Sequence, residues 1–134
     1  MIGWREWVAL PNLGIARVKA KVDTGARSSA LHVAELRSFQ QGGRAMVGFA
    51  LRLDSTELVH AQAEVVDERE VTDSGGHVTV RPFIRTQAFL GGVTSVMEIN
   101  LCSRTNMLFP MLLGRTAISG RFIVDPAQSF LLGT

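Results

Sequence analysis

Short stretches of alternating apolar and polar residues, separated by pairs of glycines, run along most of this sequence. The clearest is residues 18–22, in which valine and alanine alternate with lysine. Similar stretches occupy residues 78–84 and 93–101. A two-residue period is typical of strands with one buried face. The glycines between the stretches predict hairpin turns at Gly42-Gly43, Ser74-Gly75-Gly76 and Gly91-Gly92.

The helical signal is weak by comparison. The best candidate is residues 115–119, followed by Gly120 in the position that glycine often takes after a helix. Many short strands with one short late helix predict an all-β barrel or sandwich, and a closed barrel removes the exposed edges that so many strands would create. At 134 residues, the length predicts one domain, residues 1–134.

Composition excludes several classes of protein. An apolar fraction of 46% with 19% charged residues excludes a disordered chain, and a net charge of +2 is too small for nucleic-acid binding. No stretch approaches about 18 consecutive apolar residues, so no membrane span is expected. Cys102 is the only cysteine, which excludes an intrachain disulfide and a cysteine-rich zinc site. Because Arg5 and Glu6 lie where a signal peptide needs an apolar run, a cytoplasmic location is expected.

The sharpest local feature is Asp23-Thr24-Gly25, which directly follows the alternating stretch that ends at Val22. A strand that ends in an acid holds the carboxylate in a fixed place, and Gly25 permits a tight turn or the close approach of another chain. The pattern alone fits two interpretations equally well: an ordinary turn after a strand, or a catalytic carboxylate.

A second feature, far along the chain, favours the catalytic interpretation. Residues 111–115 read Met-Leu-Leu-Gly-Arg, an apolar strand that ends at Gly114 and Arg115. Between the two features lies a glycine-tipped hairpin at residues 71–82. The order and spacing of these elements resemble the retropepsin-type aspartic proteases over residues 15–120. The resemblance implies a closed β-barrel with one short C-terminal helix, in which the hairpin is a flap over the active site.

Four segments resemble one bacterial family more closely: residues 3–8, 19–27, 29–32 and 112–117. That family was formerly labelled an ATP-dependent zinc protease and is now regarded as retropepsin-like. Its genes often accompany ATP-grasp ligases that add glutamate to a ribosomal protein. The resemblance covers nearly the whole chain.

The older zinc label finds no support in the residues. A common zinc protease needs His-Glu-x-x-His, whereas His32, His60 and His77 are far apart in the chain. For ATP, the sequence contains no glycine-rich phosphate-binding loop. We therefore expect neither metal nor cofactor. The alternative, in which the three histidines and Cys102 converge on zinc, is the weaker one.

A single Asp-Thr-Gly implies two chains. Aspartic proteolysis needs two carboxylates that share a proton, one acting as base towards water and the other as donor to the substrate carbonyl. A two-fold homodimer would bring Asp23 of each chain together on its axis. We therefore expect a homodimer. Its substrate should be a peptide or protein, and we expect it to bind neither nucleic acid nor a membrane.

The resemblance also implies roles for the neighbouring residues. Asp23, Thr24 and Gly25 would form the catalytic motif, with Thr24 bonding backbone across the dimer. The strand end beneath this motif would be structural, through Leu113, Gly114 and Arg115. The substrate would lie against Ala26, Arg27, Ser74, Gly75, Gly76 and His77. For His77 a solvated position on the hairpin is an equally good interpretation.

One departure from viral retropepsins concerns charge. These commonly carry an acid directly after Asp-Thr-Gly-Ala, where this chain has Arg27. The acid partner of Arg115 must then come from elsewhere, and Asp125 is the candidate. Arg27, with Arg81 and Arg85 on the flap strand, would make the cleft edge basic, which favours an acidic or polyglutamylated protein tail as substrate.

Two further hypotheses remain open at this point. The first is a catalytically silent module that keeps the fold and binds peptides without hydrolysing them. The second concerns residues 129–132, which we expect by analogy of fold to add a strand at the dimer interface.

Overall fold

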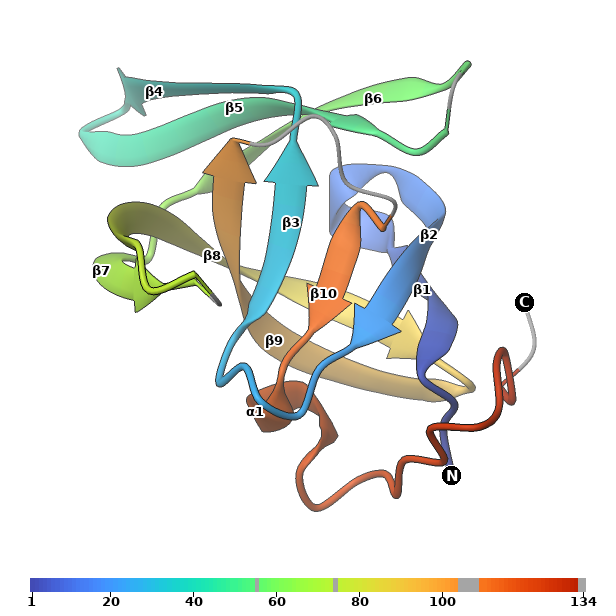
Figure 1. The fold of residues 1–134 in the computed structure, drawn as a ribbon. Coiled ribbons are helices and arrows are strands. Elements are labelled where there is room, and N and C mark those ends of the chain that lie inside the picture. Colours follow the sequence, from blue (N-terminus) through green and yellow to red (C-terminus); the bar gives the residue numbers. More distant parts are fainter. Residues whose placement is uncertain (55, 74, 104–108, 133–134) are drawn as a thin grey trace.

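The computed structural model describes residues 1–54, 56–73, 75–103 and 109–132 (Figure 1). These residues form β1 (Arg5–Leu10), η1 (Pro11–Leu13), β2 (Ile15–Val22), β3 (Ser29–Val33), β4 (Glu35–Gln41), β5 (Arg44–Arg52), β6 (Leu58–Glu64), β7 (Asp67–Thr72), β8 (Val78–Leu90), β9 (Val93–Ser103), β10 (Met111–Leu113) and α1 (Arg115–Ile118). The all-β prediction is confirmed.

Six of the strands close into a barrel. Their order is β1-β2-β10-β3-β9-β8, and β8 returns to β1 through the pairing of Phe89 with Ala9. β7 continues the sheet beyond β8 as the outer strand of a hairpin. The late strand β10 lies between β2, to which it is parallel, and β3, to which it is antiparallel. This insertion brings the Leu-Leu-Gly segment beside the end of β2, where the Asp-Thr-Gly motif begins.

A separate three-stranded sheet, β4-β5-β6, covers one end of the barrel, at the top of Figure 1. Its residues Val47, Phe49 and Leu51 are buried in the same hydrophobic core as the barrel residues. No alternating stretch in the sequence predicted these three strands, although Gly42-Gly43 does form the predicted turn, between β4 and β5. The sheet therefore adds apolar burial to the barrel at the end opposite the Asp-Thr-Gly motif.

The alternation seen in the sequence matches burial along most of the barrel. Val18 and Ala20 are buried in β2, whereas Lys21 is exposed. In β8 burial alternates from Ile84 onwards, beyond the stretch of residues 78–84 that the sequence pattern identified. The beginning of this strand differs, because Val78 and Val80 are 56% and 64% exposed. They are exposed because this half of β8 leaves the barrel and pairs only with β7.

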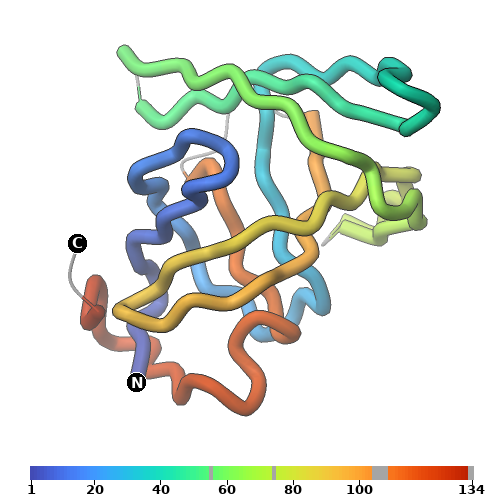
Figure 2. The backbone as a smooth tube through the Cα atoms, turned by 180° about the vertical axis from the view of Figure 1, so that it is seen from behind, coloured from blue at the N-terminus to red at the C-terminus, as the bar shows by residue number. Residues whose placement is uncertain are grey.

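The C-terminal segment lies against the N-terminal segment of its own chain (Figures 1 and 2). Within this protomer residues 129–132 take no strand conformation, so the strand expected at the dimer interface stays a prediction. The backbone amides of Leu131 and Leu132 donate hydrogen bonds to the buried carboxylate of Glu6, at 2.9 and 3.1 Å. Glu6 also accepts the amide of Gly3 at 2.7 Å.

Helical structure is as sparse as predicted. Helix α1 ends one residue earlier than expected, and Gly120 adopts the left-handed φ of 78° just beyond it. Among the described residues, no helix is long and apolar enough to cross a membrane.

Candidate active site

Asp23 directly follows the last residue of β2 and lies beside the end of β10. Its backbone amide donates to the carbonyl of Leu113 at 2.9 Å, which continues the parallel pairing of the two strands. Its side chain is half-buried, and Oδ1 accepts the backbone amide of Gly25 at 2.9 Å. Oδ2 accepts no hydrogen bond from the described residues. The strand end and the Gly25 amide therefore fix the carboxylate and leave one oxygen available.

The backbone of β10 and α1 supports the Asp23 loop, by which we mean residues 23–28. The amide of Arg115 donates to the carbonyl of Ala26 at 2.7 Å, and that of Thr116 donates to the carbonyl of Arg27 at 3.0 Å. Gly114 passes so close beneath the loop that a Cβ there would lie 2.4 Å from the backbone of Ser28. Only glycine fits this approach without a shift of the loop.

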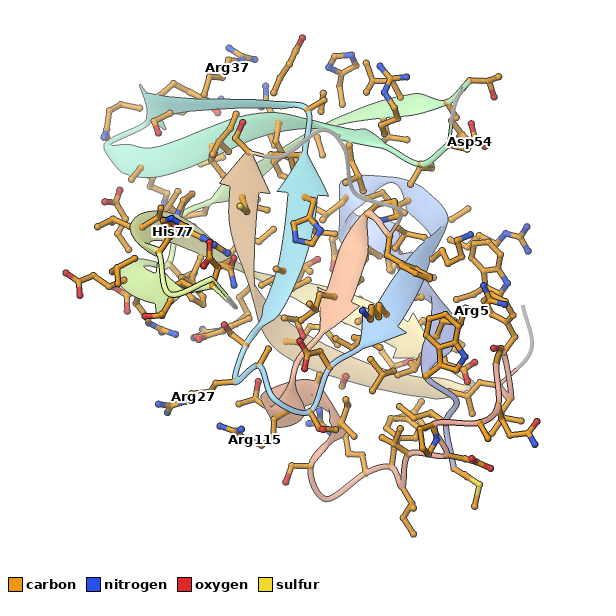
Figure 3. All side chains as sticks on the ribbon, in the orientation of Figure 1. Arg5, Arg27, Arg37, Asp54, His77 and Arg115 are labelled. Atoms are coloured by element: carbon orange, nitrogen blue, oxygen red, sulfur yellow. The ribbon has the colours of Figure 1, made fainter. Side chains whose placement is uncertain are left out.

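The side chain of Arg115 also contacts the loop, though not as expected. Its Nη1 donates to the carbonyl of Thr24 at 3.3 Å. Asp125 is not its partner: the Asp125 carboxylate accepts the amide of Ala127, and among the described residues Arg115 forms no ion pair. The guanidinium at this position thus binds a backbone carbonyl where the sequence analysis expected an acid. Arg27 and Arg115 both project outward at the lower edge of the molecule (Figure 3).

A cleft of about 1070 Å³ opens beside Asp23. Its floor is the outer face of β2, β10, β3, β9 and β8, with Lys21, Leu112, Ala30, Asn100 and Phe83 in neighbouring strands. The Asp23 loop, α1 and the β7–β8 hairpin form its walls. This volume lies at the upper end of the range for ligand-binding pockets in proteins, about 300–1,000 Å³.

The β7–β8 hairpin is the predicted flap. Its strand residues Val71 and Thr72 line the cleft, together with Asp73. At the tip, Asp73 Oδ1 accepts the amides of Gly75 and His77, both at 2.9 Å, and Gly76 takes a φ of 82°. Ser74, predicted to contact substrate, lies outside the described residues.

His77 lies on the same hairpin (Figure 3). Its side chain is 81% exposed, and Nδ1 lies 3.5 Å from Asp73 Oδ1. Gly75, Gly76 and His77 are not among the residues that line the cleft. Their contact with substrate stays a prediction.

The charges around the cleft are nearly balanced, which changes the expectation of a basic edge. Five cationic and four acidic side chains line it: Lys21, Arg27, Arg69, Arg81 and Arg121, with Asp23, Glu70, Asp73 and Glu98. Arg85 does not line the cleft, and its Nη2 binds Glu98 at 3.0 Å. Its contribution to a basic cleft edge was wrongly expected, since the strand pairing places an acid directly opposite it.

Glu98 joins three strands around this part of the cleft. It accepts Arg69 Nη1 from β7 at 2.9 Å and Arg85 Nη2 from β8 at 3.0 Å. The hydrogen bonds from Arg69 and then Arg85 hold the pKa of Glu98 below its ordinary value. Arg69 also binds Asp67 at 2.7 Å and lowers the pKa of that carboxyl.

Asn100 is a site residue that the sequence analysis missed. It is 1% exposed, and its amide nitrogen donates to the hydroxyl of Ser28 at 3.2 Å and to the carbonyl of Ser29 at 2.9 Å. Ser29 in turn accepts the backbone amide of Gly114 at 3.1 Å. The available signal was an amide inside an apolar strand, since Asn100 stands between Ile99 and Leu101.

The residues weighed as zinc ligands do not come together. His60 lies on β6 and His77 on the β7–β8 hairpin, whereas His32 and Cys102 face each other in the β3–β9 pairing. Within the described ranges, no group of three or more histidine, cysteine, aspartate or glutamate side chains is placed to hold a metal ion.

Similar proteins agree with this fold. The solved structure of Lpg0085 from Legionella pneumophila, described as having unknown function, superposes with a TM-score of 0.82 at 28% identity, over 98% of this chain and 96% of that one. Proteins named "Probable alpha-L-glutamate ligase" from Shewanella halifaxensis and Desulfotalea psychrophila are 38% and 40% identical over 99% of this chain. This chain spans only 30% and 29% of their lengths.

Residues 1–133 match a family described as "Retropepsin-like aspartic endopeptidase RimB". The match extends over the barrel, the Asp23 loop, β10 and the hairpin. This chain therefore belongs to the RimB-like family of retropepsin-like aspartic endopeptidases.

Proposed function

We propose that this chain is an aspartic peptidase that acts as a homodimer, with Asp23 of each protomer as the catalytic pair. The observation that carries the proposal is the position of Asp23, at a strand end beside the cleft with Oδ2 not bonded to the described residues. Membership of an aspartic endopeptidase family supports it.

The chemistry requires one carboxylate of the pair ionised and the other protonated. The ionised carboxylate takes a proton from a water molecule, whose oxygen adds to the peptide carbonyl carbon while the protonated carboxyl donates to the carbonyl oxygen. The tetrahedral intermediate then breaks the C–N bond, and the amine leaves with a proton. The products are a carboxylic acid and an amine, and no redox partner or metal is consumed.

The exposure of the Asp23 loop supports the second protomer as the source of the other carboxylate. Thr24 and Gly25 are exposed, although they follow a barrel strand whose interior is closely packed. The hydroxyl of Thr24 forms no hydrogen bond within the described part of the protomer. A two-fold contact through this loop would cover these residues and give the Thr24 hydroxyl a backbone partner.

For the substrate we propose an acidic peptide, with a polyglutamylated protein tail as the specific case. The relatives named probable alpha-L-glutamate ligases support this, because an enzyme that hydrolyses glutamate-rich chains would complement one that builds them. This chain spans about 30% of the length of these relatives, and the ligase activity in their name is no part of the proposal. We place the protein in the cytoplasm, which its single cysteine supports.

The test is cleavage of glutamate-tailed and ordinary peptides by wild type and Asp23→Asn, followed by mass spectrometry. We expect cleavage that resists a chelator and falls at least a thousandfold in Asp23→Asn, in line with the loss of an essential acid–base group (about 10³-fold or more). Asp54→Asn is the matched control, because Asp54 belongs to the turn before β6, far from the cleft (Figure 3). Cleavage that survives Asp23→Asn or stops with chelator contradicts the proposal, and peptide binding without cleavage identifies a silent binding module.

A further inference from the structure

Arg81 is a buried cation in the wall of the cleft. It lies on β8, only 8% exposed, where the strand leaves the barrel for the hairpin. Its Nε donates to the hydroxyl of Thr79 at 2.9 Å, and its Nη1 donates to the side-chain oxygen of Asn100 at 3.1 Å. Both partners are neutral oxygens, which hold the guanidinium in one orientation without balancing its charge.

No carboxylate balances that charge within the described residues. Every ion pair there joins other side chains. No carboxylate oxygen of these residues lies within 4.0 Å of a guanidinium nitrogen of Arg81. The third nitrogen, Nη2, has no hydrogen-bond partner among the described residues. Because no fully buried side-chain nitrogen or oxygen there lacks a partner, Nη2 must reach open space, and Arg81 lines the cleft.

Burying a guanidinium against neutral groups alone is costly, because water solvates a cation better than an amide and a hydroxyl do. A carboxylate that enters the cleft and binds Nη2 supplies the missing countercharge. Guanidinium–carboxylate hydrogen bonds are among the strongest in proteins, and strongest where solvent is excluded. A nearly buried cation with fixed orientation is therefore a recognition group for an anion.

The neighbouring arginines differ in this respect. Arg69, directly opposite Arg81 in the β7–β8 pairing, binds both Asp67 and Glu98, and Arg85 binds Glu98. Their charges are already balanced by the protein. Arg81 alone among these three combines burial, an unused nitrogen and a position in the cleft wall.

Arg81 is also connected to the Asp23 loop. Asn100 accepts from Arg81 through its oxygen and donates to Ser28 and Ser29 through its nitrogen. The side chain of Asn100 is therefore hydrogen-bonded both to the guanidinium and to the end of the loop that carries Asp23. A carboxylate bound at Arg81 would be held at a fixed offset from the bond to be cleaved.

We propose that Arg81 is the specificity-determining residue of the cleft and binds a carboxylate of the substrate peptide. The inference rests on the proposed function in one respect, that peptides bind in this cleft. The carboxylate belongs either to a glutamate side chain or to the C-terminus of the peptide. Arg81 is not a catalytic residue in this proposal, because it selects the substrate and does not contact the reacting bond.

The test measures binding separately from hydrolysis. The full-length chain with Asp23→Asn is titrated against fluorescent peptides and followed by anisotropy. One probe ends in four glutamates with an amidated C-terminus, the second has glutamine at the same four positions, and a third is the glutamine peptide with a free C-terminus. We expect the preferred carboxylate peptide to bind about tenfold or more tightly than the amidated glutamine peptide, as for a hydrogen bond between charged groups.

Arg81→Gln should reduce that ratio to about one, whereas the matched control Arg85→Gln should retain it, because Arg85 is outside the cleft. A ratio that persists in Arg81→Gln overturns the proposal. So does an absence of discrimination between the peptides by the chain with Arg81 intact, a result that needs no further substitution and cannot be attributed to misfolding. Tighter binding of the amidated glutamate peptide identifies a glutamate side chain as the source of the carboxylate. Tighter binding of the glutamine peptide with a free C-terminus identifies the C-terminus.

Failure of this inference and failure of the proposed function give different results. If the chain with Asp23 intact cleaves all three peptides equally well, the peptidase stands and the role of Arg81 falls. If no peptide is cleaved but the Arg81-dependent preference is measured, the carboxylate site stands and the peptidase falls.

Discussion

Gly114 lies at the closest approach between β10 and the Asp23 loop. A Cβ at this position would lie 2.4 Å from both the carbonyl carbon and the carbonyl oxygen of Ser28, which are backbone atoms that a rotamer change cannot move. We expect Gly114→Ala to destabilise the protein by about 1–3 kcal/mol, in the range of overpacking substitutions, and to displace the loop that holds Asp23. Denaturant unfolding measures the first effect and peptide cleavage the second.

Gly48→Ala is the matched control for this substitution. Gly48 lies in β5, and a Cβ there would contact only the side chain of Arg37, at 3.1 Å or more, which is free to shift. Its free energy of unfolding should stay within about 1 kcal/mol of wild type. An equal loss of stability in both variants would show that the backbone contact under the loop has no special role.

Glu6 is a buried carboxylate whose partners are all backbone amides. It accepts Gly3, Leu131 and Leu132, so one side chain joins the first and last described segments of the chain. Glu6→Gln replaces one acceptor oxygen by an NH₂ group that would face an amide donor. We expect a loss of about 1–3 kcal/mol, the cost of leaving a buried donor unsatisfied, and faster amide hydrogen exchange at Leu131 and Leu132.

The control is Glu35→Gln, since Glu35 is exposed on β4. It should change neither the free energy of unfolding nor the exchange at the C-terminal amides. If Glu6→Gln leaves these amides as protected as in wild type, the carboxylate does not hold the segment in place.

Among the elements, the β7–β8 hairpin depends on charge for its attachment to the barrel. Val78 and Val80 are exposed, so little apolar burial holds the hairpin, whereas Glu98 of β9 binds Arg69 of β7. The lowered pKa of Glu98 means that this contribution is fully present above the ordinary carboxyl value of 4.5 and is lost as the pH falls through the lower folded-state value. Acid should therefore loosen the hairpin.

We expect Glu98→Gln to make the melting temperature less dependent on pH than in wild type between about pH 6 and pH 3, because the variant has already lost the titrating contact. Thermal unfolding across this range measures it. Glu64→Gln serves as control, because the Arg44–Glu64 pair is more exposed, at 3.4 Å on the other sheet. If Glu98→Gln and wild type lose stability in parallel, the pair does not anchor the hairpin.

Local pattern predicted some elements and not others. The strand into Asp23, the glycine turns, the short helix after Gly114 and the hairpin were all recognisable, because each depends on residues adjacent in sequence. The partners of Arg115 and Arg85 were not. Which acid lies opposite an arginine depends on strand register: the turn at Gly91-Gly92 sets Arg85 against Glu98, whereas Asp125 lies beyond α1 with its carboxylate bonded locally.

The exposed valines and the β4–β6 sheet show the same limit on a larger scale. Alternation identifies a strand but not the element that covers its apolar face, so Val78 and Val80 give the same signal as the buried Val18. Which element covers that face depends on the tertiary structure of the whole chain. The role of Asn100 could not be predicted from the sequence, because it depends on contacts with Ser28 and Arg81, which are 72 and 19 residues away.

At the scale of the whole molecule, the protomer supplies one of the two aspartates that the proposed mechanism requires. It contains one Asp-Thr-Gly, on an exposed loop beside a cleft that Arg81 and the hairpin partly enclose. Its C-terminal segment is bonded to its own Glu6, so residues 129–132 do not supply an intersubunit strand in this conformation. The proposed dimer would bring the Asp23 loops of its two protomers together on the two-fold axis.

A mixing experiment tests this arrangement directly. If activity requires Asp23 from both protomers, a chain carrying Asp23→Asn will inactivate every wild-type chain with which it pairs. With random exchange of protomers in an equal mixture, about a quarter of the dimers are wild-type pairs, so activity per wild-type chain falls by about half. Peptide cleavage at constant wild-type concentration and increasing Asp23→Asn measures the effect, after incubation at a dilution that allows exchange. Asp54→Asn is the control, because it keeps Asp23 and lies far from the Asp23 loop (Figure 3); its added chains should be active, so the rate should rise in proportion to total chain. Activity that stays proportional to wild-type chain alone would mean that each protomer completes its own site, and the paired-aspartate mechanism would then be wrong.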